Sequence, residues 1–199
     1  KDLDTDTKNL VGFYRTRNFP EVTVKAELEE HPASREGHIT LRIDEGPRYR
    51  VAFEGNREFL DYTLKKDLVF AKEGNRNDFG LRKTIRNIIS RYRDSGYENV
   101  SVRSVAEMSS ENGQDVRTVR LVIDEGEQAL VDSVTISGNR AVDAETIRNQ
   151  LLTQPRGIIG EGAFVPDVFD DDQNAVGALY LKRGHLNPTI TGQVRWGDS

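Results

Sequence analysis

Apolar residues recur along this chain with two different periods. The longer period is that of an α-helix, and it predicts helices in the middle of the chain. Five apolar residues recur there at the spacing of one helical face: Leu81, Ile85, Ile88, Ile89 and Tyr92. This stripe predicts an amphipathic helix that opens after Asn77, because asparagine is a good N-cap residue. Upstream, Leu60, Leu64 and Leu68 recur at helical spacing and predict a first helix that ends before Gly74.

Three other stretches alternate between apolar and polar residues with the shorter period that is typical of strands. They are Tyr49–Phe53, Val100–Met108 and Val116–Asp124. A polar loop containing Asn112 and Gly113 separates the last two, and this dipeptide favours a hairpin turn. The order strand, helix, helix, strand, strand predicts an α+β fold in which two helices cover a three-stranded mixed sheet. A right-handed crossover would place the first strand parallel to the last, so the last strand is central and the penultimate strand lies at an edge.

The same order of elements recurs on both sides of this middle region. Residues 39–46 (ITLRIDEG) parallel residues 119–126 (VRLVIDEG), and the pattern of the first strand returns at Val134 and Ile136. The chain therefore consists of tandem copies of one small fold. We expect three domains: 1–46, a partial unit with the second helix and the last two strands; 47–126, a complete unit; and 127–199, a unit lacking its last strand.

A short phrase ends the second helix of each unit. It consists of a tyrosine, three intervening residues, a residue that tolerates a left-handed backbone, and then a ring in the next position. The characteristic positions are Tyr14, Asn18, Tyr92, Gly96, Tyr97, Tyr180 and Gly184. Glycine and asparagine end helices in this conformation, which predicts a structural corner between helix and sheet. An aromatic contact site is the alternative, but recurrence at one place in every unit favours a role in folding.

The junctions between units resemble those of the POTRA (polypeptide-transport-associated) domain. The resemblance rests on IDEGPRYRVAFEGN at 43–56, its counterpart IDEGEQALVDSVTISGN at 123–139, and the phrase Tyr-x-x-x-Gly-Tyr at 92–97. Asn18 departs from the glycine of this phrase, and His185 departs from its second tyrosine. Tandem POTRA domains form the periplasmic arm of outer-membrane assembly proteins of the Omp85 superfamily, which also carry a membrane β-barrel.

The resemblance implies a function and a location. It implies that the chain binds unfolded outer-membrane β-barrel polypeptides, and outer-membrane assembly lipoproteins or other accessory factors, and delivers the polypeptides to a barrel that lies outside this chain. It places the chain in the periplasm, attached to the outer membrane through that barrel. A two-partner secretion transporter and a cell-division scaffold are alternatives within the same domain family. An α+β enzyme with an unrecognised site is an alternative of a different class.

The predicted topology also indicates where an extended polypeptide would bind. An edge strand presents N–H and C=O groups that another chain can pair with through main-chain hydrogen bonds, almost regardless of its side chains. In the middle unit the expected binding strand comprises six residues: Val100, Ser101, Val102, Arg103, Ser104 and Val105. The alternative is that this edge strand has no binding role, and that the charge of Arg103 protects it against aggregation.

The amino-acid composition excludes several classes of function. The chain carries 28 Lys and Arg against 33 Asp and Glu, with both signs interspersed, so it lacks the basic stripe that nucleic acid requires. It has no cysteine, which excludes thiolate nucleophiles, disulfides and cysteine-based zinc sites. No apolar run approaches the roughly 18–20 residues of a membrane helix. The first residue is Lys1, so we expect a processed or excised segment.

Three groups of residues could suggest chemistry, but each has a simpler interpretation. Residues 157–162 (GIIGEG) lack the Lys-Ser/Thr pair of a phosphate-binding loop. The run 170–172 (DDD) could bind a cation, yet acidic residues in the first turn of a helix are expected from its dipole. Three histidines occur outside any catalytic motif: His31, His38 and His185. We therefore expect no enzyme activity, no cofactor and no metal site.

Overall fold

The computed structural model describes residues 3–31, 36–157 and 162–197. The chain forms two compact units. The first contains Lys1–Ser90 and Ser101–Glu125, and the second contains Arg91–Val100 and Gly126–Ser199. This division differs from the three domains expected from the sequence, because it groups residues 1–46 with most of the middle repeat. We keep the terms first repeat (1–46), middle repeat (47–126) and third repeat (127–199) for the sequence units.

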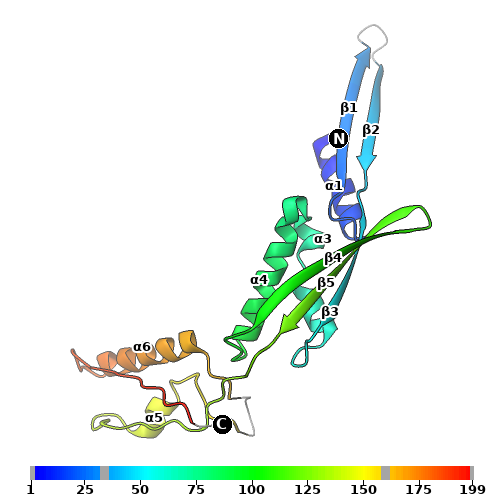
Figure 1. Cartoon of the computed structure of the whole chain (residues 1–199). Coiled ribbons are helices and arrows are strands. Elements are labelled where there is room, and N and C mark those ends of the chain that lie inside the picture. The colour runs from blue at the N-terminus through cyan, green and yellow to red at the C-terminus, as the bar shows by residue number, and fades with distance from the viewer. Residues whose placement is uncertain (1–2, 32–35, 158–161, 198–199) are drawn as a thin grey trace. The chain divides into compact units, whose positions relative to one another are not determined.

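The first repeat contributes one helix and a hairpin to the first compact unit. Helix α1 spans Leu3–Arg15, and strands β1 (Thr23–His31) and β2 (Glu36–Asp44) pair antiparallel (Figure 1). Its register pairs Val24 with Ile43, and Leu28 with Ile39. These elements are the second helix and the last two strands of the repeated order.

The middle repeat contains the full set of elements. They are β3 (Arg48–Glu54), α2 (Asp61–Leu64), η1 (Lys65–Asp67), α3 (Phe70–Glu73), η2 (Arg76–Asp78), α4 (Phe79–Arg93), β4 (Ser101–Glu111) and β5 (Gln114–Asp124). The sheet order is β3-β5-β4, with β3 parallel and β4 antiparallel to the central β5. The predicted α+β class and the predicted strand order are therefore confirmed. The β4–β5 turn uses Asn112 and Gly113, both with positive φ (51° and 79°), as a two-residue hairpin requires.

One face of this sheet is covered by helices (Figure 1). Alternate residues of β5, namely Val119, Leu121 and Ile123, are buried, and Leu64 and Ile88 are completely buried as well. Alternation with a period of two on the strand and a helical stripe on α4 bring these residues together in one core. The alternate residues of β5 on the opposite face are Thr118, Arg120 and Val122, each partly buried.

The first helix of the middle repeat differs from the prediction. The stripe of Leu60, Leu64 and Leu68 does not lie on one continuous helix, because α2 ends at Leu64 and Leu68 adopts an extended conformation (ψ 119°). Leu60 is 72% exposed, so only Leu64 has the expected core position. A helix of four residues has too few hydrogen bonds to be stable by itself, so tertiary packing decides which of its residues is buried.

The N-terminus of α4 also differs from the prediction. Asn77 does not act as the N-cap, because its backbone is left-handed (φ 52°). Asn75 takes this role instead: its Oδ1 accepts the N–H of Leu81 at 2.8 Å, and its side chain is only 1% exposed. The sequence pattern predicted the start of the helix correctly, but the capping side chain belongs to Asn75 and not to Asn77.

In the described part of the second compact unit, helices α5 (Ala144–Arg148) and α6 (Pro166–Lys182) pack around a small core. They contribute Ile147 and Val176 to this core, and Val142 completes it. The expected first strand at Val134 and Ile136 is not assigned as a strand, and neither are residues 188–192. In the described part of this unit the only β pairing is a single bridge between Leu130 and Ala163.

Candidate functional site

Strand β4 forms one edge of the middle sheet. It begins at Ser101, so Val100 of the expected binding strand lies just before it, and the residues from Ser101 to Val105 form its first half. Among the described strands β4 pairs only with β5. The side chains of Ser101, Arg103 and Ser104 are exposed, and those of Val102 and Val105 are partly buried. Its outer side is therefore the longest unpaired strand edge in the middle sheet.

The register of the hairpin determines which main-chain groups of β4 face outward. Glu111 and Gln114 flank the two-residue turn, and such a closing pair exchanges both of its hydrogen bonds. The register is continuous to Ser101 opposite Asp124, so odd-numbered residues bond to β5 and even-numbered residues point their N–H and C=O groups outward. The outward groups belong to Val102, Ser104, Ala106, Met108 and Ser110.

Charged side chains of β4 form ion pairs across the sheet. The two terminal guanidinium nitrogens of Arg50 donate to the carboxylate of Glu111, at 2.9 and 3.0 Å. This hydrogen bond and the positive charge lower the pKa of the Glu111 carboxyl. Glu107 accepts a hydrogen bond from Arg120 at 3.2 Å. These partners belong to β3 and β5, so the pairs leave the outer main-chain edge of β4 accessible.

The other edge of the sheet is partly covered. The N–H of Tyr49 on β3 donates to the carbonyl of Asn18 at 2.6 Å, so the corner of the first repeat is bonded to the first strand of the middle repeat. A second main-chain bond runs from the N–H of Asn75 to the carbonyl of Pro20 at 3.0 Å. An extended polypeptide therefore finds fewer accessible groups on β3 than on β4.

A polar cluster secures this junction between the first and middle repeats. The Tyr49 hydroxyl donates to Glu21 at 2.5 Å and accepts from Asn75 and Arg117 at 2.7 and 2.8 Å. Arg117 also pairs with Glu21 at 3.0 Å and with Asp78 at 3.2 Å. Burial raises the pKa of Tyr49 to about 12, and the hydrogen bond to Glu21 acts in the same direction. No local sequence pattern indicates this cluster, because its members are far apart along the chain.

The three corners predicted from the repeated phrase have the same geometry. Asn18, Gly96 and Gly184 adopt φ values of 71°, 87° and 89°. In each corner this residue donates to the carbonyl three positions earlier (3.1, 2.9 and 3.0 Å), and the next N–H donates to the tyrosine carbonyl (3.1, 3.0 and 3.1 Å). This is the Schellman arrangement at a helix end. The ring pairs stack edge to face at 6.0, 5.6 and 5.5 Å: Tyr14 with Phe19, Tyr92 with Tyr97, and Tyr180 with His185.

The acidic run 170–172 has a different role from the one expected. Helix α6 begins at Pro166, so these residues lie beyond its first turn, and the interpretation through the helix dipole is wrong. Asp172 is 3% exposed, and its two carboxylate oxygens accept the N–H groups of Leu152 and Thr153 at 2.7 and 2.8 Å. Thr84 has the matching position in the middle repeat, where its hydroxyl accepts the N–H of Val69 at 3.2 Å.

Other candidate groups show no cluster in the described part of the chain. No group of three or more His, Asp or Glu side chains is arranged there to hold a metal ion. Residues 158–161 of the glycine-rich segment lie outside the described residues, as does the side chain of His31. His185 is exposed and stacks on Tyr180. No helix among the described residues is long and apolar enough to span a membrane.

Comparison with known sequences identifies related proteins. The model of a family described as POTRA, surface antigen variable number repeat, matches residues 49–126 and 129–198. A protein of Treponema pallidum (strain Nichols), named as an outer membrane protein assembly factor, is 24% identical over 196 residues. That match covers 93% of this chain and 23% of the other protein. The chain thus spans about a quarter of the length of this curated relative.

Two solved structures are similar at low sequence identity. One contains POTRA domains 3–5 of BamA from Haemophilus influenzae, with a TM-score of 0.38, 17% identity, and coverage of 90% of this chain and 70% of that chain. The other is the N-terminal domain of Omp85 from the thermophilic cyanobacterium Thermosynechococcus elongatus, with a TM-score of 0.32, 19% identity, and coverage of 92% and 73%.

Proposed function

Because this chain belongs to the POTRA family, we propose that it is part of a periplasmic arm that receives unfolded outer-membrane β-barrel polypeptides and docks accessory lipoproteins. The name of the Treponema pallidum relative, an outer membrane protein assembly factor, supports this proposal. In this role the chain binds and positions its clients without enzymatic chemistry. A membrane barrel elsewhere in the longer protein completes insertion. The repeat boundaries at 46/47 and 126/127 belong to the same proposal.

The observation that carries the proposal is the outer edge of β4. Its even-numbered residues point N–H and C=O groups away from β5 at regular intervals over eleven residues. A client strand can pair with these groups and extend the sheet by one strand. Main-chain pairing is independent of most client side chains, so a single edge can receive many different β-rich polypeptides. Because most side chains of β4 are exposed, they do not restrict which side chains a client strand can carry.

Ser104 offers the sharpest test, because its side chain is exposed and its N–H points outward. Ser104→Pro removes that N–H, whereas Ser104→Val keeps it and changes only the side chain. The probe is a dye-labelled peptide of about eight alternating valines and threonines, a common strand length. We expect Ser104→Pro to weaken binding of this peptide in fluorescence anisotropy, and Ser104→Val to bind it like the unmodified chain.

The neighbouring residue provides a second comparison. Arg103 bonds β5 through its inward N–H, so Arg103→Pro should lower the melting temperature, while Ser104→Pro should leave melting and circular dichroism nearly unchanged. Client binding at β4 is rejected if the peptide binds equally to Ser104→Pro, Ala106→Pro and the unmodified chain, provided that both variants are folded.

A further inference from the structure

Helix α2 of the middle repeat begins at an unusual residue. Leu60 is its N-cap and makes no side-chain hydrogen bond to the helix. Leucine is among the poorest N-cap residues, because its side chain has no acceptor for the first N–H groups of a helix. The side chain also gains little from burial, since it is 72% exposed. Neither helix capping nor core packing therefore explains a leucine at this position.

The third repeat shows the same position with a capping residue. Asp143 precedes α5 with φ −67° and ψ 153°, and Leu60 precedes α2 with nearly the same angles, −67° and 150°. The carboxylate of Asp143 accepts both the N–H and the hydroxyl of Thr146, at 2.8 and 2.7 Å. Thr63, the counterpart of Thr146, donates its N–H to the main-chain carbonyl of Leu60 at 2.8 Å. The fold thus accepts a capping aspartate here, and the middle repeat carries a leucine instead.

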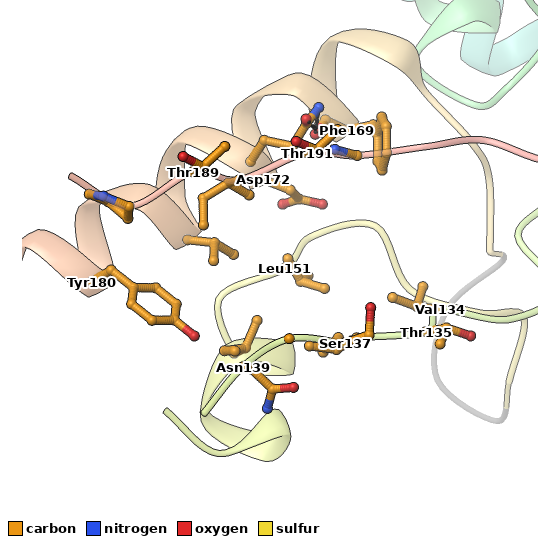
Figure 2. Close-up of a pocket in the computed structure, with 18 of the residues that line it drawn as sticks. Val134, Thr135, Ser137, Asn139, Leu151, Phe169, Asp172, Tyr180, Thr189 and Thr191 are labelled. Carbon is orange, nitrogen blue, oxygen red and sulfur yellow. Dashed lines mark hydrogen bonds between the residues drawn. The ribbon is translucent and has the colours of Figure 1, made fainter. Parts of the chain in front are cut away.

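The turns before these two helices also match in their other contacts. The side-chain amide of Asn56 donates to the carbonyl of Phe59 at 2.9 Å, and that of Asn139 donates to the carbonyl of Val142 at 3.0 Å. Asn139 borders a cavity of the third repeat (Figure 2). In the middle repeat Glu125 also accepts two main-chain N–H groups of the turn, at 2.7 and 2.9 Å. The residue before α2 is therefore held in a defined, exposed position.

Tyr62 departs from the third repeat in the same way. It is 64% exposed, and its counterpart is Glu145, an acidic residue that the dipole of a helix favours in the first turn. Leu64 of the same helix is completely buried, so the core side of α2 is already packed. Exposed apolar residues that replace locally favourable ones are typical of functional surfaces. We call Leu60, Tyr62 and the adjacent Lys66 the α2 patch.

The polar groups of the α2 patch are arranged to bind an acceptor. The ammonium of Lys66 donates to the Tyr62 hydroxyl at 3.0 Å and lies 4.4 Å from the centre of the ring, and this contact lowers the pKa of Tyr62. Because Lys66 donates, the hydroxyl keeps its own proton for another acceptor, and the ammonium keeps two further N–H donors. Within the part of the chain that the structure describes, neither group donates to a further acceptor. Neighbouring donors, one of them positively charged, fit a carboxylate.

The form of the patch favours a helix as the partner. Helix α2 has no strand edge, so a partner contacts its side chains rather than its main chain. An amphipathic helix presents an apolar stripe and a carboxylate beside it on one face. It can place that single carboxylate at Lys66, away from the carboxylate of Asp61, which is held by Asn56 at 2.9 Å. An anionic lipid surface would instead bring negative charge against Asp61 as well.

We propose that the α2 patch docks an amphipathic helix of a partner protein, whose apolar stripe covers Leu60 and whose carboxylate binds the Tyr62 hydroxyl and the Lys66 ammonium. Helix α2 follows β3, the strand at the opposite edge of the sheet from β4. As a docking surface the patch rests on the docking role proposed above. Ser104→Pro, which tests client binding at β4, should leave it unaffected, so failure of one proposal can be distinguished from failure of the other.

The test uses the full 199-residue chain and a designed helical peptide. The peptide has about 18 residues, because shorter ones are marginal helices in water. Its leucines recur every three or four positions, and glutamates flank this stripe. A control peptide has glutamine in place of each glutamate. Binding is followed through the amide NMR signals of the isotope-labelled chain. We expect the glutamate peptide to shift signals of residues 59–66 and to bind about fivefold more tightly than the glutamine peptide.

Matched variants separate the apolar and the charged contact. Leu60→Asp introduces the residue of the third repeat, so it should weaken binding of both peptides by about tenfold or more without lowering the melting temperature, because aspartate caps the helix. Lys66→Gln should weaken binding of the glutamate peptide to the level of the glutamine peptide and leave the glutamine peptide unaffected. Arg86→Gln removes an exposed charge of α4 and should change neither affinity.

Three results would overturn the assignment. The first is a lower melting temperature of Leu60→Asp, which would show that Leu60 packs within this chain. The second is binding of the glutamate peptide that is absent, or equal for the unmodified chain and Leu60→Asp. The third is binding to phosphatidylglycerol vesicles that Leu60→Asp abolishes while the peptide does not bind. That result would identify a lipid surface as the partner.

Discussion

Replacing Gly96 by alanine tests the corner geometry, because Gly184 provides a matched control in the same compact unit. Both glycines have nearly the same φ, 87° and 89°, at the same position of the same helix-ending motif. An added Cβ at Gly96 would lie 2.7 Å from the carbonyl oxygen of Ala129 and 3.2 Å from the Cβ of Ala163. A Cβ at Gly184 would meet no atom within 4 Å.

The two substitutions should therefore differ by the collision alone. A left-handed alanine costs about 1–2 kcal/mol, and this should be the whole effect of Gly184→Ala. Overpacking adds about 1–3 kcal/mol, so Gly96→Ala should lose about 2–5 kcal/mol of the free energy of unfolding. Ala129 also donates its N–H to the Gly96 carbonyl at 2.9 Å, which prevents the two segments from simply moving apart.

Trp196 provides the assay. It is the only tryptophan of the chain, and its ring stacks edge to face on Phe164 at 5.6 Å, so its fluorescence follows unfolding of the second compact unit. Urea titrations of both variants give the two free energies under identical conditions. Equal losses for Gly96→Ala and Gly184→Ala would show that the close approach to Ala129 does not exist, and no loss for either would contradict the left-handed corner.

Substitutions at three further positions should affect stability in defined ways. Asp172→Ala leaves one buried and one partly buried N–H group without an acceptor and should cost about 2–4 kcal/mol in the same urea titration, with Asp172→Asn losing less. Thr84→Val removes one acceptor and should cost about 1–2 kcal/mol, measured by circular dichroism; no loss in either repeat would contradict the shared role. Because Tyr49 has a raised pKa, it holds its proton longer when folded, so stability should fall between pH 10 and about 12. Tyr49→Phe should flatten this fall, and an unchanged pH slope would contradict the buried hydroxyl.

The order of elements could be predicted because local patterns determine it. The stripe of α4, the turn at Asn112 and the crossover rule were sufficient for the sheet order and for the edge position of β4. The resemblance to tandem POTRA domains is confirmed by the family match over residues 49–126 and 129–198. Repetition also located the three corners, since a left-handed helix end has a strong residue preference.

The remaining features depend on contacts between residues that are distant along the chain. Asp172 looks like any acidic residue near a helix start, and only the folded structure places it beside the N–H of Leu152. The cluster around Tyr49 and Arg117 joins positions 68 residues apart, with no local pattern to reveal it. The choice of Asn75 over Asn77 as the cap was likewise decided by packing.

The Tyr49 cluster has a consequence for dissecting this protein into fragments. A polypeptide that starts at residue 49, where the family match begins, would keep Tyr49 and Arg117 but lose Glu21 and the carbonyl of Asn18. The Tyr49 hydroxyl and the Arg117 guanidinium, which both bond Glu21 in the longer chain, would then have to hydrogen-bond to water instead. Deleting the first repeat therefore also alters its neighbour, and a phenotype of such a truncation cannot be assigned to the removed repeat alone.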